Sequence, residues 1–240
     1  MAAIDRSLVA KLPMFVGLAP AEQDELLREA RSVRYPKGTA VFGQGMEADR
    51  FFLLLHGHLR VEKTTPQGQQ SVVRYVSAGK LFGVAQAMNL THYPATAVAA
   101  VDSIALAWQS FSWHRLIAKY PSLASTALQT VGSRLQDTQA RVMEMSNEQV
   151  EQRVAHALLR LAKQAGRKVE AGVEIDFPIS RQDVAEMTGT TLHTVSRILS
   201  AWESEGLVEG GRQRIVLRVA HRLHGLAEGE EAVRVRKRGH

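Results

Sequence analysis

Residues 179–207, ISRQDVAEMTGTTLHTVSRILSAWESEGL, constrain the fold more than any other stretch of the chain. Ser180 is a favourable N-cap residue, and the apolar residues after it recur at helical spacing until Thr188 and Gly189 end the segment. A second helix is predicted to begin at Thr190 or Thr191. Its apolar side is predicted to hold Leu192, Val195, Ile198, Leu199 and Trp202. Two helices joined by a tight glycine turn indicate a helix-turn-helix.

The polar side of the second predicted helix carries the side chains that would meet DNA. An arginine and short hydrogen-bonding side chains near the start of such a helix suit the major groove. These residues are His193, Thr194, Ser196, Arg197 and Ser200. Spacing alone leaves an ordinary helical hairpin with a solvated face equally open.

Residues 208–219 favour the DNA-binding alternative. They contain two short strand-like runs around Gly210, Gly211 and Arg212. A basic hairpin in this position is typical of a wing beside a recognition helix. The sequence therefore predicts a winged helix-turn-helix.

The segment SRQDVAEMTGTTLHTVSRILSAWESEGLVE resembles the DNA-binding domain of the CRP/FNR superfamily of bacterial transcription regulators, in which a T-V-S-R stretch opens the recognition helix. The resemblance implies an α+β protein with an antiparallel β-roll similar to cyclic-nucleotide-binding domains, a dimerisation helix and a winged helix-turn-helix. The expected domains are 1–120 (a sensor β-roll with flanking short helices), 121–146 (the dimerisation helix) and 147–240 (the DNA-binding domain). The implied partners are a second copy of the chain, an inverted-repeat operator in double-stranded DNA, and RNA polymerase.

Composition excludes several other classes of protein. The 240 residues are 45% hydrophobic and 22% charged, as in ordinary globular proteins, and the net charge of +6 permits a nucleic-acid partner without requiring one. The chain has no cysteine, which excludes disulfides, cysteine nucleophiles and iron–sulfur clusters. No run approaches the roughly 20 apolar residues of a membrane span, so we expect a cytoplasmic protein.

Motifs of catalysis are missing from the sequence. We find no GxSxG, Walker A, HExxH or GxGxxG pattern and no paired carboxylates in a credible site, so we expect no enzyme, no catalytic residue and no metal site. The rival outside enzymes is a ligand-binding module of the same fold that has lost DNA binding.

Residues 33–107 consist of brief apolar runs interrupted by turns, which predicts an all-β domain after a short amphipathic helix at 19–30. Tight corners of a small roll favour glycine, and the glycine spacing is similar to that of the cyclic-nucleotide-binding roll. The glycines are Gly38, Gly45, Gly57, Gly68, Gly79 and Gly83.

The sequence departs from the nucleotide-binding members at the positions that hold the ligand. Those members carry a glutamate for the ribose hydroxyls and an Arg-Ser pair for the cyclic phosphate, where this chain has Val84 and Tyr93-Pro94. A buried phosphodiester needs a cation or several donors. We therefore expect no binding of cyclic AMP.

A long helix is predicted from Pro121, with one apolar stripe at steps of three and four residues. Packing on its own roll is one possibility, but in a chain that resembles this superfamily the stripe favours a dimer coiled coil. The stripe comprises Leu123, Ala127, Val131, Leu135, Thr138, Val142 and Met145. The opposite, polar side holds Arg134, Gln136, Asp137, Gln139, Arg141 and Glu144.

A hinge is predicted at Ser146-Asn147, with Asn147 capping a further helix that ends at Gly166. Residues 167–178 are predicted to form a turn and one strand. The charged tail, EEAVRVRKRGH, is predicted to be frayed.

Arg197 is the leading base reader, since a guanidinium can bind guanine O6 and N7 together, worth about 1–3 kcal/mol. A phosphate clamp is its alternative role. Ser196 and Thr194 could reach bases or phosphates, and His193 replaces a glutamate that many relatives carry, which changes the TTG…CAA-like half-sites that the resemblance implies. The predicted phosphate contacts are Arg181, Thr191, Arg212 and Arg214.

The signal is open to several interpretations. The HTVSR and YPATA segments and the missing cysteines most resemble the nitrogen-oxide-responsive NnrR/DNR-like branch. In that branch the regulator responds to nitric oxide or low oxygen and controls denitrification genes, often as an activator. That resemblance implies haem, for which the possible ligands are His56, His58, His92 and His114. An unidentified small molecule, or DNA binding without any ligand, stays open.

Overall fold

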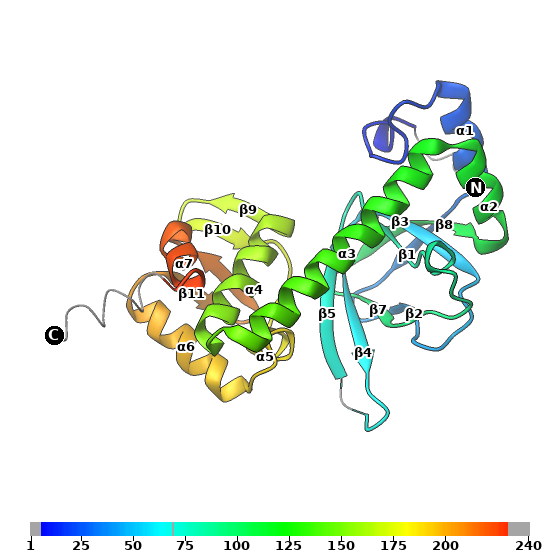
Figure 1. The fold of residues 1–240 in the computed structure, drawn as a ribbon. Helices are drawn as coiled ribbons and strands as arrows, with labels where there is room; N and C mark the ends of the chain where they lie inside the picture. The colour runs from blue at the N-terminus through cyan, green and yellow to red at the C-terminus, as the bar shows by residue number, and fades with distance from the viewer. Residues whose placement is uncertain (1–5, 69, 230–240) are drawn as a thin grey trace. The chain divides into compact units, whose positions relative to one another are not determined.

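The computed structural model describes residues 6–68 and 70–229, and the chain forms two compact units (Figure 1). The N-terminal unit contains the chain up to Thr138, apart from Gln70–Val72. The C-terminal unit contains that short piece and the chain from Gln139 onward, so the boundary falls inside the long helix predicted as a separate domain. The α+β class predicted from the sequence is confirmed.

Two four-stranded sheets form the N-terminal roll, in the orders β1-β8-β3-β6 and β2-β7-β4-β5. The all-β prediction for this segment is confirmed. The strands are β1 (Arg31–Tyr35), β2 (Ala40–Phe42), β3 (Arg50–His56), β4 (His58–Thr64), β5 (Gln70–Ser77), β6 (Leu81–Phe82), β7 (Thr96–Ala99) and β8 (Ser103–Gln109).

Glycine forms the corners of the roll as the spacing predicted. All six glycines of the predicted series have positive φ, between 65° and 86°. At Gly57, between β3 and β4, a Cβ atom would lie 2.3 Å from Oγ of Ser103 in β8, so a larger residue would push this turn away from the start of β8.

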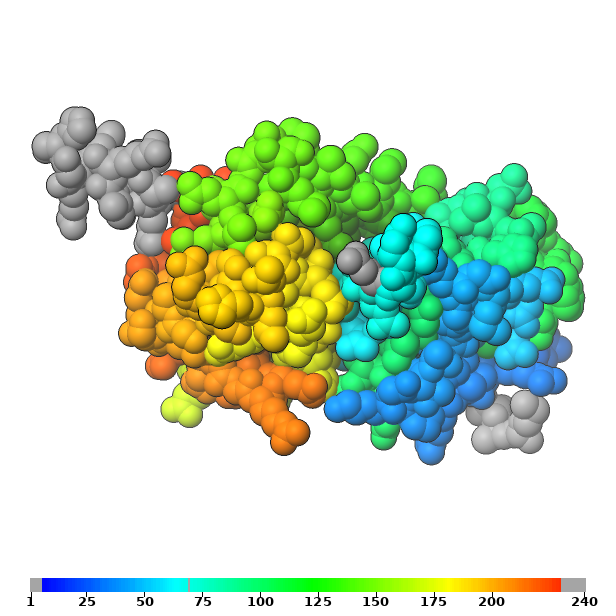
Figure 2. All heavy atoms as spheres, turned by 90° about the horizontal axis from the view of Figure 1, so that it is seen from below, coloured from blue at the N-terminus to red at the C-terminus, as the bar shows by residue number. Residues whose placement is uncertain are grey.

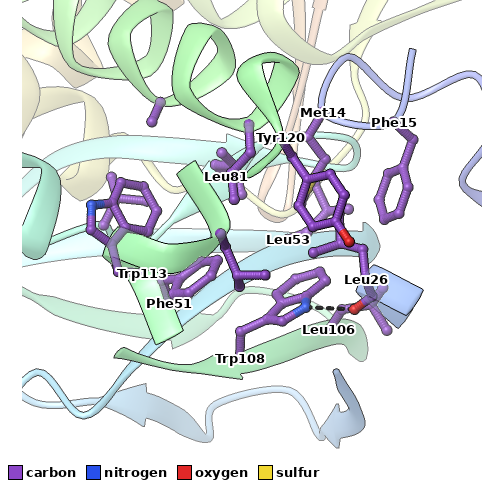
Figure 3. Packing of buried hydrophobic residues seen from close by; sticks show 14 of the residues in the cluster. Met14, Phe15, Leu26, Phe51, Leu53, Leu81, Leu106, Trp108, Trp113 and Tyr120 are labelled. Atoms are coloured by element: carbon purple, nitrogen blue, oxygen red, sulfur yellow. Dashed lines mark hydrogen bonds between the residues drawn. The ribbon is translucent and has the colours of Figure 1, made fainter. Parts of the chain in front are cut away.

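Aromatic side chains fill the centre of the N-terminal unit (Figure 3). Phe51 stacks on Trp108 and meets Trp113 edge to face. The Trp108 indole donates a 2.9 Å hydrogen bond to the Leu26 carbonyl, which attaches the first helix to the roll. The helices of this unit are η1 (Arg6–Leu8), α1 (Pro20–Arg28), η2 (Gln86–Met88), η3 (Ser110–Ser112) and α2 (Trp113–Lys119).

The long helix α3 (Pro121–Asn147) begins at the predicted proline, but its apolar stripe is divided between two roles. Leu123 and Ala127 are buried in the core of the N-terminal unit, so the prediction that they contribute to dimerisation is wrong. The first turns of α3 follow α2 directly and pack on the same apolar cluster of the N-terminal unit. Leu123 and Ala127 are buried in that cluster and are not available to a second chain. Farther along, Leu135, Val142 and Met145 are more than half exposed.

The polar side of α3 also differs from its prediction at two residues. Glu144 is 8% exposed and forms an ion pair with Arg160. Arg134 is only partly exposed, with two of its nitrogens fully buried. Helical spacing placed both side chains opposite the apolar stripe, but it carries no information on what packs against that face.

The break between α3 and α4 (Val150–Ala165) lies two residues later than predicted. Asn147 is the last residue of α3 rather than a cap, because the amide of Glu148 still donates to the Glu144 carbonyl at 3.0 Å. Gln149 is the N-cap of α4, and its amide donates to Gln152 Oε1 at 3.0 Å. The predicted end of α4 at Gly166 is confirmed.

The C-terminal unit holds a four-stranded antiparallel sheet in the order β11-β12-β10-β9. The segment predicted as one strand forms a hairpin of β9 (Gly166–Val169) and β10 (Gly172–Ile175). Helix α7 (Ala220–Ala227) was not predicted; it packs on α4. The tail predicted to be frayed lies outside the described residues. Within residues 6–68 and 70–229, no helix has both the length and the apolar character needed to cross a bilayer.

Candidate nucleic-acid interface

The helix-turn-helix is formed by α5 (Arg181–Thr188) and α6 (Leu192–Ser204). Ser180 caps α5 as predicted: its hydroxyl accepts from the Asp183 amide at 3.0 Å, and Asp183 Oδ2 accepts from the Ser180 amide at 2.7 Å. Gly189 ends α5 with φ 62°, and Thr191 caps α6 by accepting from the Thr194 amide at 3.2 Å. The sequence prediction of this motif is confirmed.

One face of α6 is buried, but Leu192 does not lie on it. Val195, Ile198, Leu199 and Trp202 are buried as predicted. Leu192 is 47% exposed, so its assignment to the apolar side is wrong. The first residue of α6 therefore presents an apolar side chain to solvent.

The far end of α6 is attached to α4. The indole Nε1 of Trp202 donates to Glu151 Oε1 at 3.0 Å, and the ring is 1% exposed. Glu151 lies in the first turn of α4. This bond joins the two helices in a part-buried, charge-assisted contact.

The predicted wing is formed by β11 (Val208–Gly211) and β12 (Arg214–Leu217). Arg212 and Gln213 make the turn between them, with Gln213 at φ 57°. The wing and α6, in orange and yellow, lie next to each other on the face seen in Figure 2. A helix and a hairpin tip placed side by side can contact a groove and its flanking phosphates together.

The predicted DNA-binding arginines fall into two classes. Arg197 on α6 and Arg212 at the wing tip are exposed, and neither forms an ion pair with any residue of the described chain. Arg181 donates to Glu203 Oε1 at 2.9 Å and to Ser200 Oγ at 3.3 Å. Arg214 donates to Glu209 at 2.7 Å and to Glu174 at 3.0 Å, and these carboxylates raise its pKa.

The neutral candidates lie around Arg197. His193 and Thr191 are exposed, whereas Ser196 and Thr194 are half-buried. The hydroxyls of Thr191 and Thr194 are 2.9 Å apart and hydrogen-bonded. The exposed surface of the first two turns therefore combines Leu192, His193 and Arg197.

The residues at the nucleotide-binding positions of the roll face apolar surroundings. Val84 is 1% exposed within the aromatic core. Tyr93 stacks on Phe42 at a centroid distance of 3.9 Å, and its hydroxyl donates to the Arg50 carbonyl at 2.7 Å. Burial raises the pKa of Tyr93 to about 12, so the ring stays neutral near pH 7. Neither side chain offers a charge or a free donor to a phosphodiester.

None of the four candidate haem ligands is fully buried. His56, His92 and His114 are exposed, and His58 is half-buried. His92 shares a 2.9 Å hydrogen bond with Thr91 Oγ1. His114 lines an open, mixed-polarity cavity of about 400 Å³ together with Glu47 and Asp49. Within the described part of the chain, no three His, Asp or Glu side chains are arranged to hold a metal ion.

Comparison with known proteins matches both units. Residues 32–120 match the cyclic nucleotide-binding domain family, and residues 152–226 match the Crp-like helix-turn-helix domain family. The cyclic AMP receptor protein of Thermus thermophilus is 32% identical over 90% of this chain and 97% of its own length. The nitrogen fixation regulation protein FixK of Bradyrhizobium diazoefficiens is 27% identical over 81% of this chain and 82% of its own length.

Among solved structures, FixK2 from Bradyrhizobium japonicum superposes with a TM-score of 0.71 over 82% of this chain and 96% of that chain, at 24% identity. This structural similarity shows the fold alone. The two matched domain families and the Thermus relative also show the protein family, because together they span both the roll and the helix-turn-helix. The chain therefore belongs to the CRP/FNR family of DNA-binding transcription regulators, a family without enzymatic activity.

Proposed function

We propose that this protein regulates transcription as a homodimer that binds an inverted-repeat operator through Arg197. The observation that supports this most directly is the exposed guanidinium of Arg197, free of any ion pair in the described chain, on the helix that the wing flanks. A guanidinium already paired with a carboxylate would have to break that pair before it reached DNA. Arg197 carries no such cost.

The exposed part of the α3 stripe supports the dimer. Side chains with steps of three and four residues form the seam of a coiled coil, and a seam left open to solvent is stabilised by burial against a second copy. Leu128, which is 75% exposed and lies one turn before Val131, adds to the exposed part of the stripe, although it was not among the predicted residues. The proposed seam comprises Leu128, Val131, Leu135, Thr138, Val142 and Met145.

A twofold dimer would offer two copies of α6 to successive major grooves about 34 Å apart. Selection of bound duplexes from a random pool should therefore return a palindrome. Its affinity should fall steeply with salt, because Arg197 and Arg212 of both chains would displace counterions. A ligand-binding module that has lost DNA binding would return neither result. We further propose that the dimer acts in the cytoplasm and contacts RNA polymerase, either as an activator or as a repressor.

The exposed Leu192 suggests a base contact that sequence reasoning missed. Apolar side chains at the start of a recognition helix contact the thymine methyl group in the major groove. Replacing the contacted thymine with deoxyuridine should weaken binding about fourfold per half-site, the value of one buried methyl group. Titration of matched duplexes measures this, and Leu192→Ala should bind both duplexes equally. Continued discrimination by that variant would assign the methyl contact to another residue.

Arg181 and Arg214 have different proposed roles from the phosphate contacts predicted for them. Arg181 links the start of α5 to Ser200 and Glu203 of α6, which fixes the position of the recognition helix. Arg214 is held between carboxylates from β10 and β11, which stiffens the wing. Among the predicted phosphate contacts, Arg212 then remains as the free cation and Thr191 as a neutral donor.

We propose that cyclic AMP does not bind to this protein, although the Thermus relative is named as its receptor. The support is local: Val84 and Tyr93 turn apolar surfaces to the interior at the two positions that need a carboxylate and a cation. Calorimetric titration should show no heat of binding at millimolar cyclic AMP. A saturable isotherm, or tighter operator binding with cyclic AMP present, would overturn this part of the proposal.

We propose nitric oxide or low oxygen, sensed through haem, as the signal, and this proposal derives from the sequence resemblance alone. The side chain that binds the haem iron would be His56, His58, His92 or His114. Reconstitution with haemin under argon, followed by absorption spectra with and without nitric oxide, tests it. A Soret band at the same wavelength as that of free haemin would show that haem is not bound. If the band shifts in the wild type, the His→Ala variant that loses the shift identifies the iron ligand.

A further inference from the structure

Gly210 on the wing strand β11 lies directly against the side chain of Glu203 on the recognition helix α6. A Cβ atom at position 210 would lie 2.0 Å from Oε1 and 3.1 Å from Cδ of Glu203, and the first distance is far inside van der Waals contact. The backbone conformation does not require glycine here, because φ of Gly210 is not positive. A carboxylate therefore occupies the space that any side chain at position 210 would need.

Glu203 cannot leave that space without losing its partner. Its Oε1 atom accepts a 2.9 Å hydrogen bond from Nη2 of Arg181, the first residue of α5. Nη1 of the same guanidinium group donates to Ser200 Oγ at 3.3 Å, so Arg181 is attached to α6 at two points. An alanine at position 210 would either displace the carboxylate from Arg181 or move the wing strand away from α6.

The wing does not close completely on the helix-turn-helix. A cavity of about 150 Å³ is lined by residues of both wing strands and of both helices, and Arg181, Glu203 and Gly210 lie at its wall. Protein interiors are normally close-packed, so a space of this size leaves fewer side-chain contacts to hold the wing in place. The polar contacts around the cavity therefore contribute more to the position of the wing than they would in a filled interface.

The tip of the wing is close to this contact along the chain. Gly210 pairs with Ile215 in the β11–β12 ladder, and only one further pair separates it from the turn. Arg212 lies in that turn, two residues after Gly210. A displacement at Gly210 would therefore be carried to Arg212, the exposed cation proposed to contact a phosphate. That contact can form only if the wing tip and α6 reach one duplex together.

We propose that Glu203, Gly210 and Arg181 form a wing clamp, which sets the distance between the wing and the recognition helix. Glu203 fills the gap, Arg181 holds its carboxylate, and Gly210 provides the room for it. The three residues are positioning residues: they hold Arg212 where it reaches a phosphate while Arg197 is in the major groove. This inference rests on the proposed function, because it concerns the geometry of DNA binding.

Gly210→Ala should weaken binding of the operator and of random duplex alike, by roughly tenfold for the dimer, and reduce the salt slope by about 2. The reason is that Arg212 of both chains loses its phosphate, so adding Arg212→Ala to Gly210→Ala should cause no further loss. Titration of both duplexes at several salt concentrations measures affinity and slope together.

Gly211→Ala is the matched control. Gly211 is the next residue of the same strand, is also exposed and also has no positive φ. Outside its chain neighbours, its Cβ atom would meet only Arg214, at 3.5 Å and beyond, which is an ordinary contact distance. This variant should bind both duplexes as the wild type does.

The Glu203→Ala background separates the clamp from any other effect of the substitution. Without the glutamate side chain, the nearest atom to a Cβ at position 210, apart from its chain neighbours, is Nη2 of Arg181 at 3.7 Å. Gly210→Ala should then change the affinity of Glu203→Ala by less than about twofold. Wild-type binding by Gly210→Ala, or the same loss in both backgrounds, would refute the clamp. A wild type that binds no duplex would instead overturn the proposed function.

Discussion

Arg197→Ala should abolish the preference of the protein for its operator over random duplex. Each half-site would lose a bidentate contact worth about 1–3 kcal/mol, so the dimer would lose about 2–6 kcal/mol of discrimination, or roughly 30-fold to 10⁴-fold. A competition shift assay between the selected palindrome and a scrambled duplex measures the ratio directly. The fold should be unaffected, because Arg197 is exposed and forms no ion pair in the described chain.

Arg212→Ala is the matched control for this prediction, since it removes the same charge from the wing tip. A phosphate contact carries no sequence information, so this variant should weaken the operator and the random duplex alike and reduce the salt slope of the dimer by about 2, one for each chain. If Arg197→Ala behaves in that same way, Arg197 is a phosphate clamp and the proposed base reading is wrong.

Leu135→Asp should dissociate the dimer, and the protein should therefore lose its high-affinity DNA binding. Leu135 is 59% exposed in the single chain, so the change does not disturb the core of either unit, but it would set two carboxylates against each other across the twofold axis. Sedimentation should show a monomer at micromolar concentration. Operator affinity should fall about 10²-fold to 10⁴-fold, the avidity lost when two half-sites are no longer linked.

Gln136→Asp tests whether position rather than charge is responsible. Gln136 is the next residue of α3, is exposed and lies outside the proposed seam. The substitution introduces the same carboxylate side chain at this neighbouring position. This variant should stay dimeric and bind the operator normally. A monomeric Gln136→Asp, or a dimeric Leu135→Asp, would move the interface away from the α3 stripe.

Local chemistry accounts for what the sequence predicted correctly. The Ser180 cap, the Gly189 turn and the glycine corners each depend on a few neighbouring residues, and the structure has them where they were expected. The buried face of α6 follows from helical periodicity over three turns, for which Val195, Leu199 and Trp202 suffice.

The errors arise where packing between distant segments decides. Leu123 and Leu135 share one stripe in the sequence, yet only Leu123 is buried within the chain, because the aromatic core ends between them. Arg181 and Arg214 look like free cations until their carboxylate partners, 22 and 40 residues away, are brought near.

The Trp202–Glu151 bond has a mechanical consequence for regulation. Because Glu151 at the start of α4 accepts a hydrogen bond from Trp202 near the end of α6, a movement of α4 would be passed on to the helix that carries Arg197. A small rotation at the break between α3 and α4 would move the Arg197 guanidinium toward or away from the base that it contacts in DNA. Cutting this link with Trp202→Phe should leave the arginine in place while uncoupling it from any signal that arrives through α4.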